Sequence, residues 1–587
     1  MKQTRRKKAI LTPLILRYSP VYLIGLAALF MVDYVQLFSP QYMGEVTDGL
    51  ASHTLDQAGV WDLCLKIIFC GALHLLGRFV WRYCIFGTAR KVERIMRNQL
   101  FAQLETLTQR YYHEHKTGDL MSYFTNDLEA VRMAVGPSIV TAFDATVMTV
   151  LVLYRMITHV SLTLTLYTLI PMGILAVGGY FYGKVIEVRY RKMQKAFADL
   201  QDYVQESVSG ERVVKAFVQE KKQFEAFREV NERKRQASLN VVKVNALFIP
   251  SLRLLVGATY VIAIVVGGYY TMIGNMTLGR FVMFTSYISS LVWPMIALGD
   301  AITSISQGIA GMNRIHEVMD EVSEIQDPED PDDVRSLSGQ LSFDHVSFAY
   351  ADNLPDKLTD VSVQVQPGET LAIMGRTGSG KSTFVNLLCR LYDVEHGSIS
   401  YDGHDIKKIP LSVLRENIAY VPQDNFLFSQ TLSGNISFGR LDASKEEIIR
   451  AAKAADIHEN IMEFPDQYDT MVGERGVTLS GGQKQRSSIA RALLKDSPIL
   501  ILDDSLSAVD TDTEERILEN LKEYRAGKTN IIIAHRVSTV QNADHILVLD
   551  EGRPAEYGTR EELMAKGGIF ASMARKQQLE RQLQLVD

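Results

Sequence analysis

Apolar residues are concentrated in the first half of the chain, where they form six separate runs. The runs lie near residues 20–40, 63–83, 138–157, 163–183, 250–273 and 281–303. Each run approaches the ~20 apolar residues that a helix needs to cross the hydrocarbon core of a bilayer. The pattern predicts a polytopic α-helical membrane domain with six spans over residues 1–318.

The six runs are arranged in three pairs, and long polar connections separate the pairs. These connections, 84–135 and 184–245, contain almost no Pro or Gly and carry charged residues at helical spacing. A periodic sequence without breakers is typical of continuous helix. We therefore expect the spanning helices to extend well beyond the membrane on one side.

Basic residues predict the orientation of the spans. Lys and Arg are frequent before the first run and in both long connections, whereas the first short connection, QYMGEVTDGLASHTLDQAG, contains neither. Cytoplasmic loops carry an excess of Lys and Arg. The N-terminus, the long connections and the second half are thus expected in the cytoplasm, and the protein in the plasma membrane of a bacterium. A large soluble helical protein is the alternative, and the charge bias disfavours it.

Several ionisable side chains fall inside or near the spans. Such groups are costly in lipid, so they face the bundle interior, a partner or a water-filled path. These ionisable residues either contact substrate or pair with residues of neighbouring helices. The aromatic residues of the sixth run either line a substrate path or pack against other helices. The ionisable residues are Asp33, Arg78, Arg82, Asp144, Arg155, Arg253 and Asp300. The candidates for a substrate path are Asp144, Phe284, Tyr287 and Trp293.

Composition adds a few limits. A chain of 587 residues is too long for one domain. Its net charge of −6 gives no indication of nucleic-acid binding as the main role. The four cysteines, Cys64, Cys70, Cys84 and Cys389, lack the spacing of disulfide frameworks or metal sites, so we interpret them as free packing residues.

The second half has a different pattern. The stretch EVMDEVSEIQDPEDPDDVRSLSG after the sixth run is acidic and contains two prolines, which predicts a linker over 319–339. From 340 to 587, short β-rich runs alternate with helical stretches. This alternation predicts an α/β nucleotide-binding domain.

A phosphate-binding loop lies near the start of this domain. GRTGSGKST follows the strand-like TLAIM, precedes a helical stretch, and fits G-x-x-x-x-G-K-[ST]. In such loops the backbone N–H groups cradle phosphates, the lysine reaches the β and γ phosphates, and the hydroxyl faces Mg²⁺. ATP and Mg²⁺ are therefore the expected ligands. The predicted ATP-binding residues here are Gly375, Arg376, Thr377, Gly378, Ser379, Gly380, Lys381, Ser382 and Thr383.

In a second motif, ILILDDS, two adjacent aspartates follow four apolar residues. In phosphate-loop ATPases a carboxylate at the end of a neighbouring strand helps to hold Mg²⁺. Asp503 is predicted to take this role with Ser382, and Asp504 is placed to orient and deprotonate the attacking water. A capped strand end is the alternative for two acids alone, and the phosphate loop upstream disfavours it.

At LSGGQ the chain resembles the ATP-binding-cassette transporters, and VGERGVTLSGGQKQRSSIARAL is close to the pattern of their exporter branch. Ser and Gly at a helix N-terminus let hydroxyl and N–H groups bind a phosphate. In this family the signature acts on the nucleotide that the other subunit holds. The resemblance therefore implies that the chain is half of a transporter and dimerises. The signature residues are Leu479, Ser480, Gly481, Gly482 and Gln483.

The resemblance covers nearly the whole chain and implies roles for further residues. Tyr350 in VSFAY matches the residue that stacks on adenine, and Gln423 in YVPQDNFLF matches the glutamine near the γ-phosphate and Mg²⁺. Asp510 in SAVD matches the dimer-facing loop, and His535 in IIIAHR matches the switch histidine. The implied catalytic set is Lys381, Gln423, Asp504 and His535, and the implied Mg²⁺ set is Ser382, Gln423 and Asp503. TGDLMSYFTNDLEAV and ESVSGERVVKAF look like the turns that couple the two domains.

Position 504 departs from the family pattern, which has glutamate after the metal-binding aspartate. Asp504 is one methylene shorter, and a misplacement of about 1 Å costs on the order of 10²-fold in rate. We expect this chain's own site to bind ATP and hydrolyse it poorly, while its intact LSGGQ completes a site on an unlike partner. The combination resembles the degenerate-site subunit of bacterial heterodimeric multidrug exporters of the Bacillus type. A slow homodimer is the alternative.

The expected function is ATP-driven export by alternating access, with transport ATPase activity and amphiphilic drug-like or lipid-like substrates. The expected partners are a second half-transporter, the bilayer and the small substrate, with no nucleic acid. A homodimeric slow exporter or lipid flippase is the alternative within this class. A non-transporting, ATP-sensing regulatory subunit is the alternative from another class, and the intact signature and His535 speak against it. An importer is disfavoured because both domains share one chain.

Overall fold

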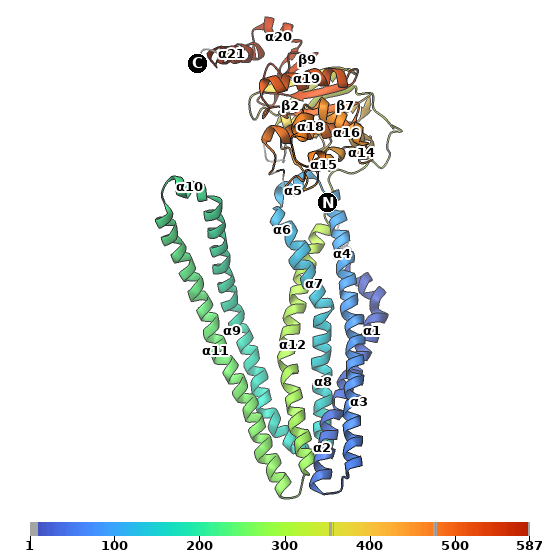
Figure 1. The fold of residues 1–587 in the computed structure, drawn as a ribbon, viewed down its shortest axis with the longest axis vertical. Helices are drawn as coiled ribbons and strands as arrows, with labels where there is room; N and C mark the ends of the chain where they lie inside the picture. Colours follow the sequence, from blue (N-terminus) through green and yellow to red (C-terminus); the bar gives the residue numbers. More distant parts are fainter. Residues whose placement is uncertain (1–9, 351–354, 356, 474–475, 477, 585–587) are drawn as a thin grey trace. The chain divides into compact units, whose positions relative to one another are not determined.

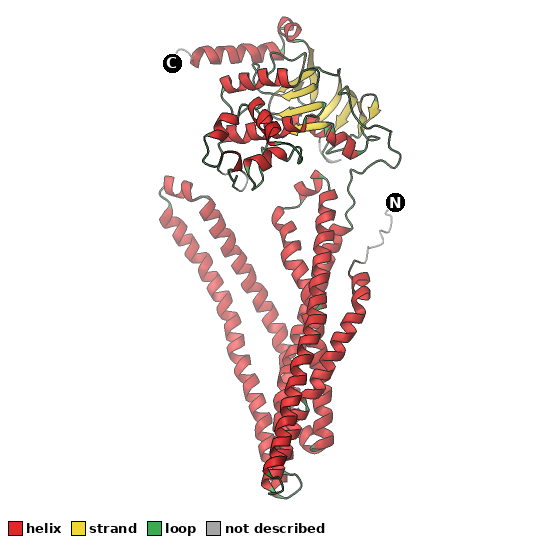
Figure 2. Cartoon of the chain, turned by 45° about the vertical axis from the view of Figure 1, so that its right-hand side comes forward, coloured by secondary structure: helices red, strands yellow, loops and turns green. Residues whose placement is uncertain are grey.

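The computed structural model describes residues 10–350, 355, 357–473, 476 and 478–584. The chain forms two compact units. The membrane unit comprises Met1–Glu105 with His115–Glu321, and the nucleotide unit comprises Thr106–Glu114 with Val322–Asp587. Helices form the first unit, and strands occur only in the second among the described residues (Figure 2).

The membrane unit contains six continuous helical stretches that are long and apolar enough to span a bilayer, which confirms the six predicted spans. Three of them are broken into shorter helices, and π-helical turns η1 and η2 interrupt two. The first three stretches comprise α1 (Leu11–Gln36) with α2 (Phe38–Ala51), then α3 (Gln57–Trp81), η1 (Arg82–Phe86) and α4 (Gly87–Thr106), then α6 (Thr117–Ser122), η2 (Tyr123–Asp127), α7 (Leu128–Val135) and α8 (Pro137–His159). The others are α9 (Leu162–Ser209), α11 (Glu220–Met272) and α12 (Leu278–Met319), with the short α10 (Glu211–Ala216) between α9 and α11.

Side-chain caps mark where three of these helices begin. Asp56 accepts the backbone N–H of Gly59 at 2.8 Å and starts α3. Ser161 and Thr277 occupy the same capping position before α9 and α12. Each cap satisfies one of the N–H groups that a helix start leaves unpaired. The short connections between paired spans therefore have sharply defined ends.

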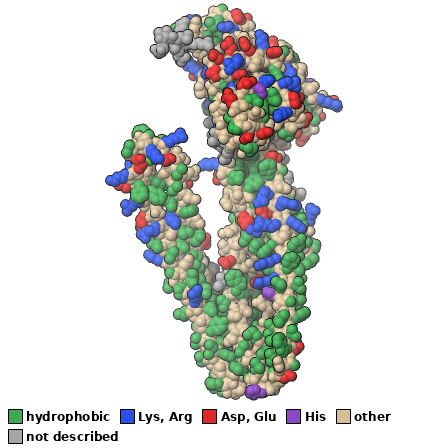
Figure 3. All heavy atoms as spheres, in the orientation of Figure 1, with side chains coloured by type: hydrophobic (Ala, Val, Ile, Leu, Met, Phe, Trp, Pro, Cys, Tyr) green, Lys and Arg blue, Asp and Glu red, His purple; other side chains and the backbone are tan. Residues whose placement is uncertain are grey.

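The helices pack around two apolar cores, one shared by α8, α9, α11 and α12 and one shared by α1, α3 and α8. α9 and α11 run side by side along their length (Figure 1). α12 packs on α2, α7 and α8, and α1 packs on α3 and α8. Apolar side chains cover much of the outer surface of the long helices (Figure 3), including Phe69, Leu75 and Phe79 of α3. A surface of this kind is suited to lipid, in which the helices satisfy their own backbone groups.

The nucleotide unit contains two sheets. An antiparallel sheet has the order β2-β1-β4-β5, and a mixed sheet has the order β10-β9-β3-β8-β7-β6, in which only β10 is antiparallel to its neighbour. The strands are β1 (Leu341–Phe348), β2 (Leu358–Val365), β3 (Thr370–Gly375), β4 (His396–Tyr401), β5 (His404–Asp405), β6 (Ile418–Val421), β7 (Ile499–Asp503), β8 (Thr529–Ile533), β9 (His545–Asp550) and β10 (Arg553–Gly558). This arrangement confirms the predicted α/β domain.

Helices cover both faces of the mixed sheet, so its inner strand β7 is buried at every position. Strands buried on both faces are expected to be continuously apolar, as ILIL is. The helices of this unit are α5 (Gln109–Glu114), α13 (Lys381–Leu388), α14 (Leu411–Glu416), α15 (Leu432–Ser437), α16 (Lys445–Ala454), α17 (His458–Met462), η3 (Gln467–Asp469), α18 (Gly481–Lys495), α19 (Thr511–Tyr524), α20 (Arg560–Lys566) and α21 (Ile569–Gln584).

A short piece of the first half belongs to the nucleotide unit. Arg110 of α5 forms an ion pair with Glu324 at 3.0 Å, and the Tyr392 hydroxyl lies 3.4 Å from Nδ1 of His113. The stretch from Thr117 that resembles a coupling turn forms α6, η2 and α7 of the membrane unit. Its coupling role stays a prediction, and Thr106–Glu114 immediately before it belongs to the nucleotide unit.

Candidate nucleotide-binding and signature sites

The phosphate loop runs from the end of β3 to the start of α13. Gly375 has φ of +151°, and a Cβ at this position would lie 2.2 Å from the carbonyl oxygen of Leu549. Gly380 has φ of +98°, and a Cβ there would lie 2.7 Å from the carbonyl oxygen of Lys357. Only glycine fits such positions without strain. The loop therefore turns tightly onto the N-terminus of α13, where backbone N–H groups face an anion.

Lys381 begins α13 and is buried inside this loop. Its Nζ donates hydrogen bonds to the carbonyl oxygens of Gly375 at 3.0 Å and Arg376 at 2.9 Å. Burial lowers the pKa of the Lys381 ammonium, and the nearby carboxylates of Asp504 and Asp503 act in the opposite direction. The lysine is thus held among oxygen acceptors at the place where the phosphates of a nucleotide would lie.

Asp503 ends β7 next to the phosphate loop. The Ser382 hydroxyl donates to Oδ1 of Asp503 at 3.3 Å, and the Tyr420 hydroxyl of β6 lies within hydrogen-bonding reach of the same carboxylate. Mg²⁺ prefers carboxylate and hydroxyl oxygens together with phosphates, so Ser382 and Asp503 fit the predicted Mg²⁺ position. When bound there, Mg²⁺ neutralises charge on the β and γ phosphates.

The pKa of Asp503 makes binding of Mg²⁺–ATP sensitive to pH. Burial is the largest cause that raises this pKa above its ordinary value of 3.8. The carboxyl group therefore keeps its proton to a higher pH than usual, and a metal ligand must be deprotonated. We expect the affinity for Mg²⁺–ATP to fall as the pH falls through this raised pKa, before an ordinary aspartate would titrate. Titration calorimetry from pH 8 to about pH 5 checks this.

The control for this titration is Asp503→Asn, which should give a weaker affinity with a shallower dependence on pH, since the terminal phosphate of ATP itself takes up a proton near pH ~6. His535→Ala should retain the pH dependence of the wild type. A wild-type affinity that is constant over the range, or a steep fall that persists in Asp503→Asn, would contradict the assignment.

Asp504 follows at the carboxyl end of β7, half-buried, with a left-handed φ of +47°. Its backbone N–H donates to the carbonyl of Ile533 at 3.2 Å, which fixes the turn against β8. The Asp504 carboxylate lies close enough to Lys381 and His535 to act electrostatically on both. Burial, followed by Lys381, lowers the pKa of His535, so its ring is neutral at pH 7. The structure thus brings the predicted residues Lys381, Asp503, Asp504 and His535 together.

Tyr350 and Gln423 were predicted to complete this site. The Tyr350 hydroxyl lies 3.0 Å from Oγ1 of Thr383 in α13, which places its ring beside the phosphate loop. Tyr392, which the sequence did not single out, meets this ring edge-on with centroids 5.1 Å apart. Gln423 is exposed in the loop after β6. The contacts between described residues do not join its side chain to Ser382 or Asp503.

The signature LSGGQ starts helix α18 with a capping box. The Ser480 hydroxyl accepts the N–H of Gln483 at 3.3 Å, and Oε1 of Gln483 accepts the N–H of Ser480 at 2.9 Å. Leu479 is buried and anchors the turn, whereas Ser480 and Gly481 are exposed. A Cβ on Gly482 would lie 3.0 Å from the carbonyl oxygen of Ala508. The sequence therefore builds an exposed, preformed helix N-terminus that carries a hydroxyl group.

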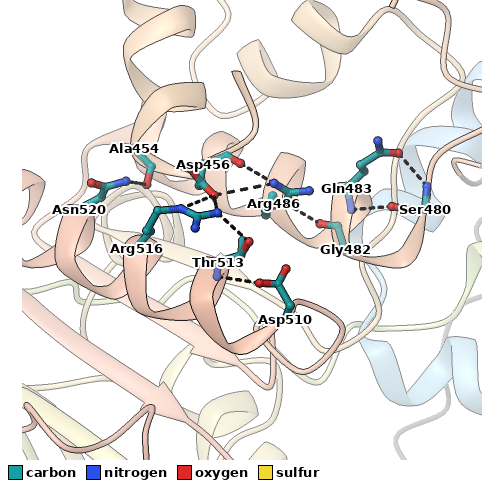
Figure 4. Close-up of polar contacts among 10 residues, drawn as sticks. All are labelled: Ala454, Asp456, Ser480, Gly482, Gln483, Arg486, Asp510, Thr513, Arg516 and Asn520. Carbon is teal, nitrogen blue, oxygen red and sulfur yellow. Dashed lines mark hydrogen bonds and ion pairs between the residues drawn. The ribbon is translucent and has the colours of Figure 1, made fainter. Parts of the chain in front are cut away.

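A polar network connects the signature helix to the loop of Asp510 (Figure 4). Arg486 donates to the carbonyl oxygens of Gly482 and Asp456 at 3.3 and 2.5 Å. Arg516 of α19 donates to the Asp456 carboxylate at 2.9 Å and also to the Thr513 hydroxyl. Asp510 caps α19 by accepting the N–H of Thr513 at 2.9 Å. Asp456 is thus the link between the signature and the dimer-facing loop.

We expect Asp456→Asn to destabilise the nucleotide unit by about 1–3 kcal/mol, because it removes the charge shared by two arginines. Asparagine tolerates the left-handed φ of +54° that Asp456 adopts, so backbone strain does not contribute. Chemical unfolding of the full chain, monitored by far-UV circular dichroism, measures the change in the free energy of unfolding. Asp496→Asn is the matched control, since Asp496 also has φ of +54° but pairs only with the partly exposed Lys528. Equal effects of both variants would contradict the role of the network.

Sequence reasoning did not find Tyr420, Gln485 and Asp456. Tyr420 contacts Asp503 from β6 because β6 and β7 are neighbours in the sheet. Gln485, which is buried, accepts the N–H of Ala508 at 2.9 Å and so fixes the loop before Asp510. The only sequence signal for Gln485 was its place two residues after LSGGQ. Asp456 had no local signal, because its partners lie 30 and 60 residues away.

The candidates for a substrate path occupy different environments. Phe284 and Tyr287 are fully buried in the apolar core beside α8, and the Tyr287 hydroxyl donates to the carbonyl of Leu37 at 3.0 Å. Their burial favours the packing alternative. Trp293 is 62% exposed, and Asp144 is half-buried beside Asp33. A path along α8 and α12 that includes Asp144 and Trp293 remains a prediction.

Comparison with known proteins gives a consistent result for both units. Residues 22–295 match the family model of the ABC transporter transmembrane region, and residues 358–507 match the ABC transporter model. The chain is 39% identical to the probable multidrug resistance ABC transporter ATP-binding/permease protein YheI of Bacillus subtilis, over 95% of each chain. It is 36% identical to an ATP-dependent lipid A-core flippase of Syntrophus aciditrophicus, over 81% of this chain and 78% of that one.

A solved structure shares the fold over nearly the full length. This is a bacterial Atm1-family ABC exporter with ATP bound, which superposes with a TM-score of 0.75 at 28% identity and covers 97% of this chain and 99% of that chain. The helical spans, the phosphate loop and the signature described above therefore lie in a fold that this solved ABC exporter shares. The chain belongs to the ABC transporter family and is a transport ATPase of the exporter type, a multi-pass protein of the plasma membrane with a cytoplasmic ATPase domain.

Proposed function

We propose that this chain is one half of a heterodimeric exporter and that its own ATP site hydrolyses ATP slowly. The observation that carries the proposal is the side chain at position 504. Asp504 occupies the turn beside Lys381 and His535 where a water-activating base must lie. Its side chain is one methylene shorter than the glutamate that active sites of this family use, whereas the signature of the same chain is complete.

At its own site the chain holds ATP. The backbone N–H groups of the phosphate loop and Lys381 bind the phosphates, and Tyr350 stacks on the adenine. Ser382 and Asp503 supply oxygen atoms for Mg²⁺. The neutral His535 holds a hydrogen bond near the γ-phosphate. Asp504 lies too far back to take a proton from the attacking water, and geometry precedes pKa in deciding whether a general base works.

At the partner's site the chain acts through its signature. Ser480 and the first N–H groups of α18 are exposed and already ordered by the capping box. They stabilise the γ-phosphate of an ATP molecule held by the partner, whose glutamate activates the water. Preorganised donors of this kind are the main source of transition-state stabilisation in phosphoryl transfer. Closure of the two ATPase domains drives the membrane domains to release substrate outward.

The proposed substrates are amphiphilic drug-like or lipid-like molecules. Relatives of this chain are named as multidrug transporters and as a lipid A-core flippase. The long apolar helices with a few ionisable side chains suit a substrate that has an apolar body and a polar group.

The proposal is tested by purifying the chain alone and together with a second half-transporter that carries glutamate at the matching position. Nucleotide-dependent uptake of a fluorescent amphiphile into inside-out vesicles is the readout. We expect ATP binding but little turnover from the chain alone, and transport from the pair. ATP turnover by the chain alone at the rate of the pair would contradict the degenerate site. ATP-dependent regulation of the partner without any transport would favour the regulatory subunit instead.

A further inference from the structure

Two carboxyl groups from different spans meet inside the membrane unit. Asp33 lies on α1 and Asp144 on α8, and their side chains are within hydrogen-bonding reach of each other. Both residues belong to stretches that are long and apolar enough to cross a membrane. About three turns earlier in α1, the Tyr22 hydroxyl donates to the carbonyl of Val135 at 2.9 Å, at the end of α7 just before α8 begins. The meeting of the carboxyl groups therefore follows from how α1 and α8 pack.

Asp33 is nearly inaccessible, with 2% of its surface exposed. Its Oδ2 atom has no hydrogen-bond donor among the residues that the structure describes. Asp144 is half-buried, so the pair has an accessible side. A buried carboxylate oxygen without a hydrogen-bond donor destabilises the fold, because it has lost its hydration and gained no partner in exchange. The unpartnered Asp33 oxygen and the neighbouring Asp144 carboxyl group are two separate observations, and both indicate that a positive charge belongs between the two residues.

Charged side chains on the neighbouring helices are engaged elsewhere. His74 of α3 hydrogen-bonds the main chain of Val32 and lies near Arg78. Arg82 of η1 lies over the ring of Trp81 at 5.5 Å. Arg155 of α8 lies over the rings of Tyr34 and Phe38 and contacts Gln41 and His159.

The acids of α2 are engaged as well. Glu45 accepts from Gln41 at 3.1 Å, and Asp48 accepts from Thr277 and the N–H of Gly279, each at 2.6 Å. Within the described part of the chain, the contacts of Asp33 therefore include a second acid and no basic side chain.

Two carboxylates this close in a medium of low dielectric cannot both be ionised without a positive charge between them. We propose that Asp33 and Asp144 together bind one positive charge inside the membrane unit. This charge has two possible chemical sources, a proton or the cationic group of an amphiphilic molecule. The second source rests on the proposed export function, whereas the first does not.

The proton is tested by infrared spectroscopy of the purified full chain in lipid nanodiscs. We expect the stretching band of a protonated carboxyl group at pH 7, sensitive to deuterium exchange, that changes in both Asp33→Asn and Asp144→Asn. In Asp33→Asn the band should vanish, because the half-buried Asp144 then ionises; in Asp144→Asn it should lose its wild-type position and shift in frequency, because the buried Asp33 loses the neighbouring carboxyl group. Asp48→Asn is the matched control, since the Asp48 carboxylate accepts two hydrogen bonds and should be ionised already. Far-UV circular dichroism and thermal unfolding of each variant in the nanodiscs show that its membrane unit is folded.

The cationic molecule is tested by binding of a fluorescent quaternary ammonium dye and of an uncharged dye to the same preparations. Occupation of the pair by the dye predicts at least ~10-fold weaker binding of the cationic dye in both variants, and unchanged binding of the uncharged dye. Either the band or the selective loss of cation binding supports the site. The proposal is overturned if wild type lacks the band and binds both dyes as the variants do. Neither measurement needs a partner or ATP turnover, so its failure is separate from failure of the heterodimer proposal.

Discussion

Replacing Asp504 by glutamate is expected to raise ATP turnover at this chain's own site by on the order of 10²-fold. The added methylene moves the carboxylate forward by roughly 1 Å, toward the water that must lie in line with the γ-phosphate. The other groups of the site are already in place. Lys381 is held by the phosphate loop, Ser382 contacts Asp503, and His535 is close to both Lys381 and position 504.

The substitution should leave the fold intact. Position 504 is half-buried at the end of β7, and its backbone is fixed by the N–H bond to Ile533. Glutamate must adopt the same left-handed φ of +47°, a cost shared by any residue with a side chain. A small loss of stability is therefore expected together with a large gain in rate. These two effects are separable by measuring thermal unfolding beside ATP turnover.

The measurement is phosphate release at saturating Mg²⁺–ATP by this chain paired with a second half-transporter whose own catalytic glutamate is replaced by glutamine, so that turnover reports on this chain's site. Asp504→Gln is the matched control, because it has the length of glutamate without its basicity and should remain slow. Asp442→Glu makes the same substitution at an exposed position in the loop before α16. Slow turnover in Asp504→Glu, with normal ATP binding, would show that side-chain length does not limit the site. Fast turnover in Asp504→Gln would show that the carboxylate is not a base.

The fold was largely predictable because its signals are strong and local. Six long apolar runs can only be buried by lipid or by one another, and the structure shows six helices of spanning length. The carboxyl ends of β3, β7 and β8 meet at one edge because these strands are parallel neighbours, so motifs at residues 375, 503 and 535 come together. The breaks in the helices were not predictable, since π-helical turns such as Arg82–Phe86 depend on packing rather than on Pro or Gly.

The sequence alone did not predict which residues distant along the chain contact each other. No motif indicated that Thr106–Glu114 belongs to the nucleotide unit. Its ion pair, Arg110 with Glu324, joins residues 214 positions apart. Asp33 and Asp144 were each identified as unusual in a span, but only the packing of α1 on α8 shows that they form a pair. Sequence motifs therefore identify which residues can carry out the chemistry, and the tertiary structure determines which of them lie together in one site.

Replacing Gly481 by aspartate is expected to abolish most ATP turnover by the assembled pair, with a loss on the order of 10²-fold or more. Gly481 is exposed in the first turn of α18, and a Cβ there makes only ordinary contact, at 3.6 Å, with Ala508. An acidic residue in the first turn also stabilises a helix. The variant should therefore fold normally while it places a negative charge where the γ-phosphate of the partner's ATP must bind.

The charge, rather than the shape, is the cause of this expected loss. Gly481→Asn adds nearly the same atoms without the charge, so the pair should retain far more turnover with it than with Gly481→Asp. Ser444→Ala provides a second control, because Ser444 forms an equivalent capping box at α16, away from the signature. Fluorescent ATP binding to this chain's own phosphate loop should be unchanged in all three variants. An equal loss with asparagine would mean that the added atoms rather than the charge cause it, and a pair that is insensitive to aspartate would mean that this signature does not contact the nucleotide of the partner. If instead the loss were confined to ATP turnover by the chain alone, two copies of this chain would have to complete each other's sites, as the homodimer alternative requires.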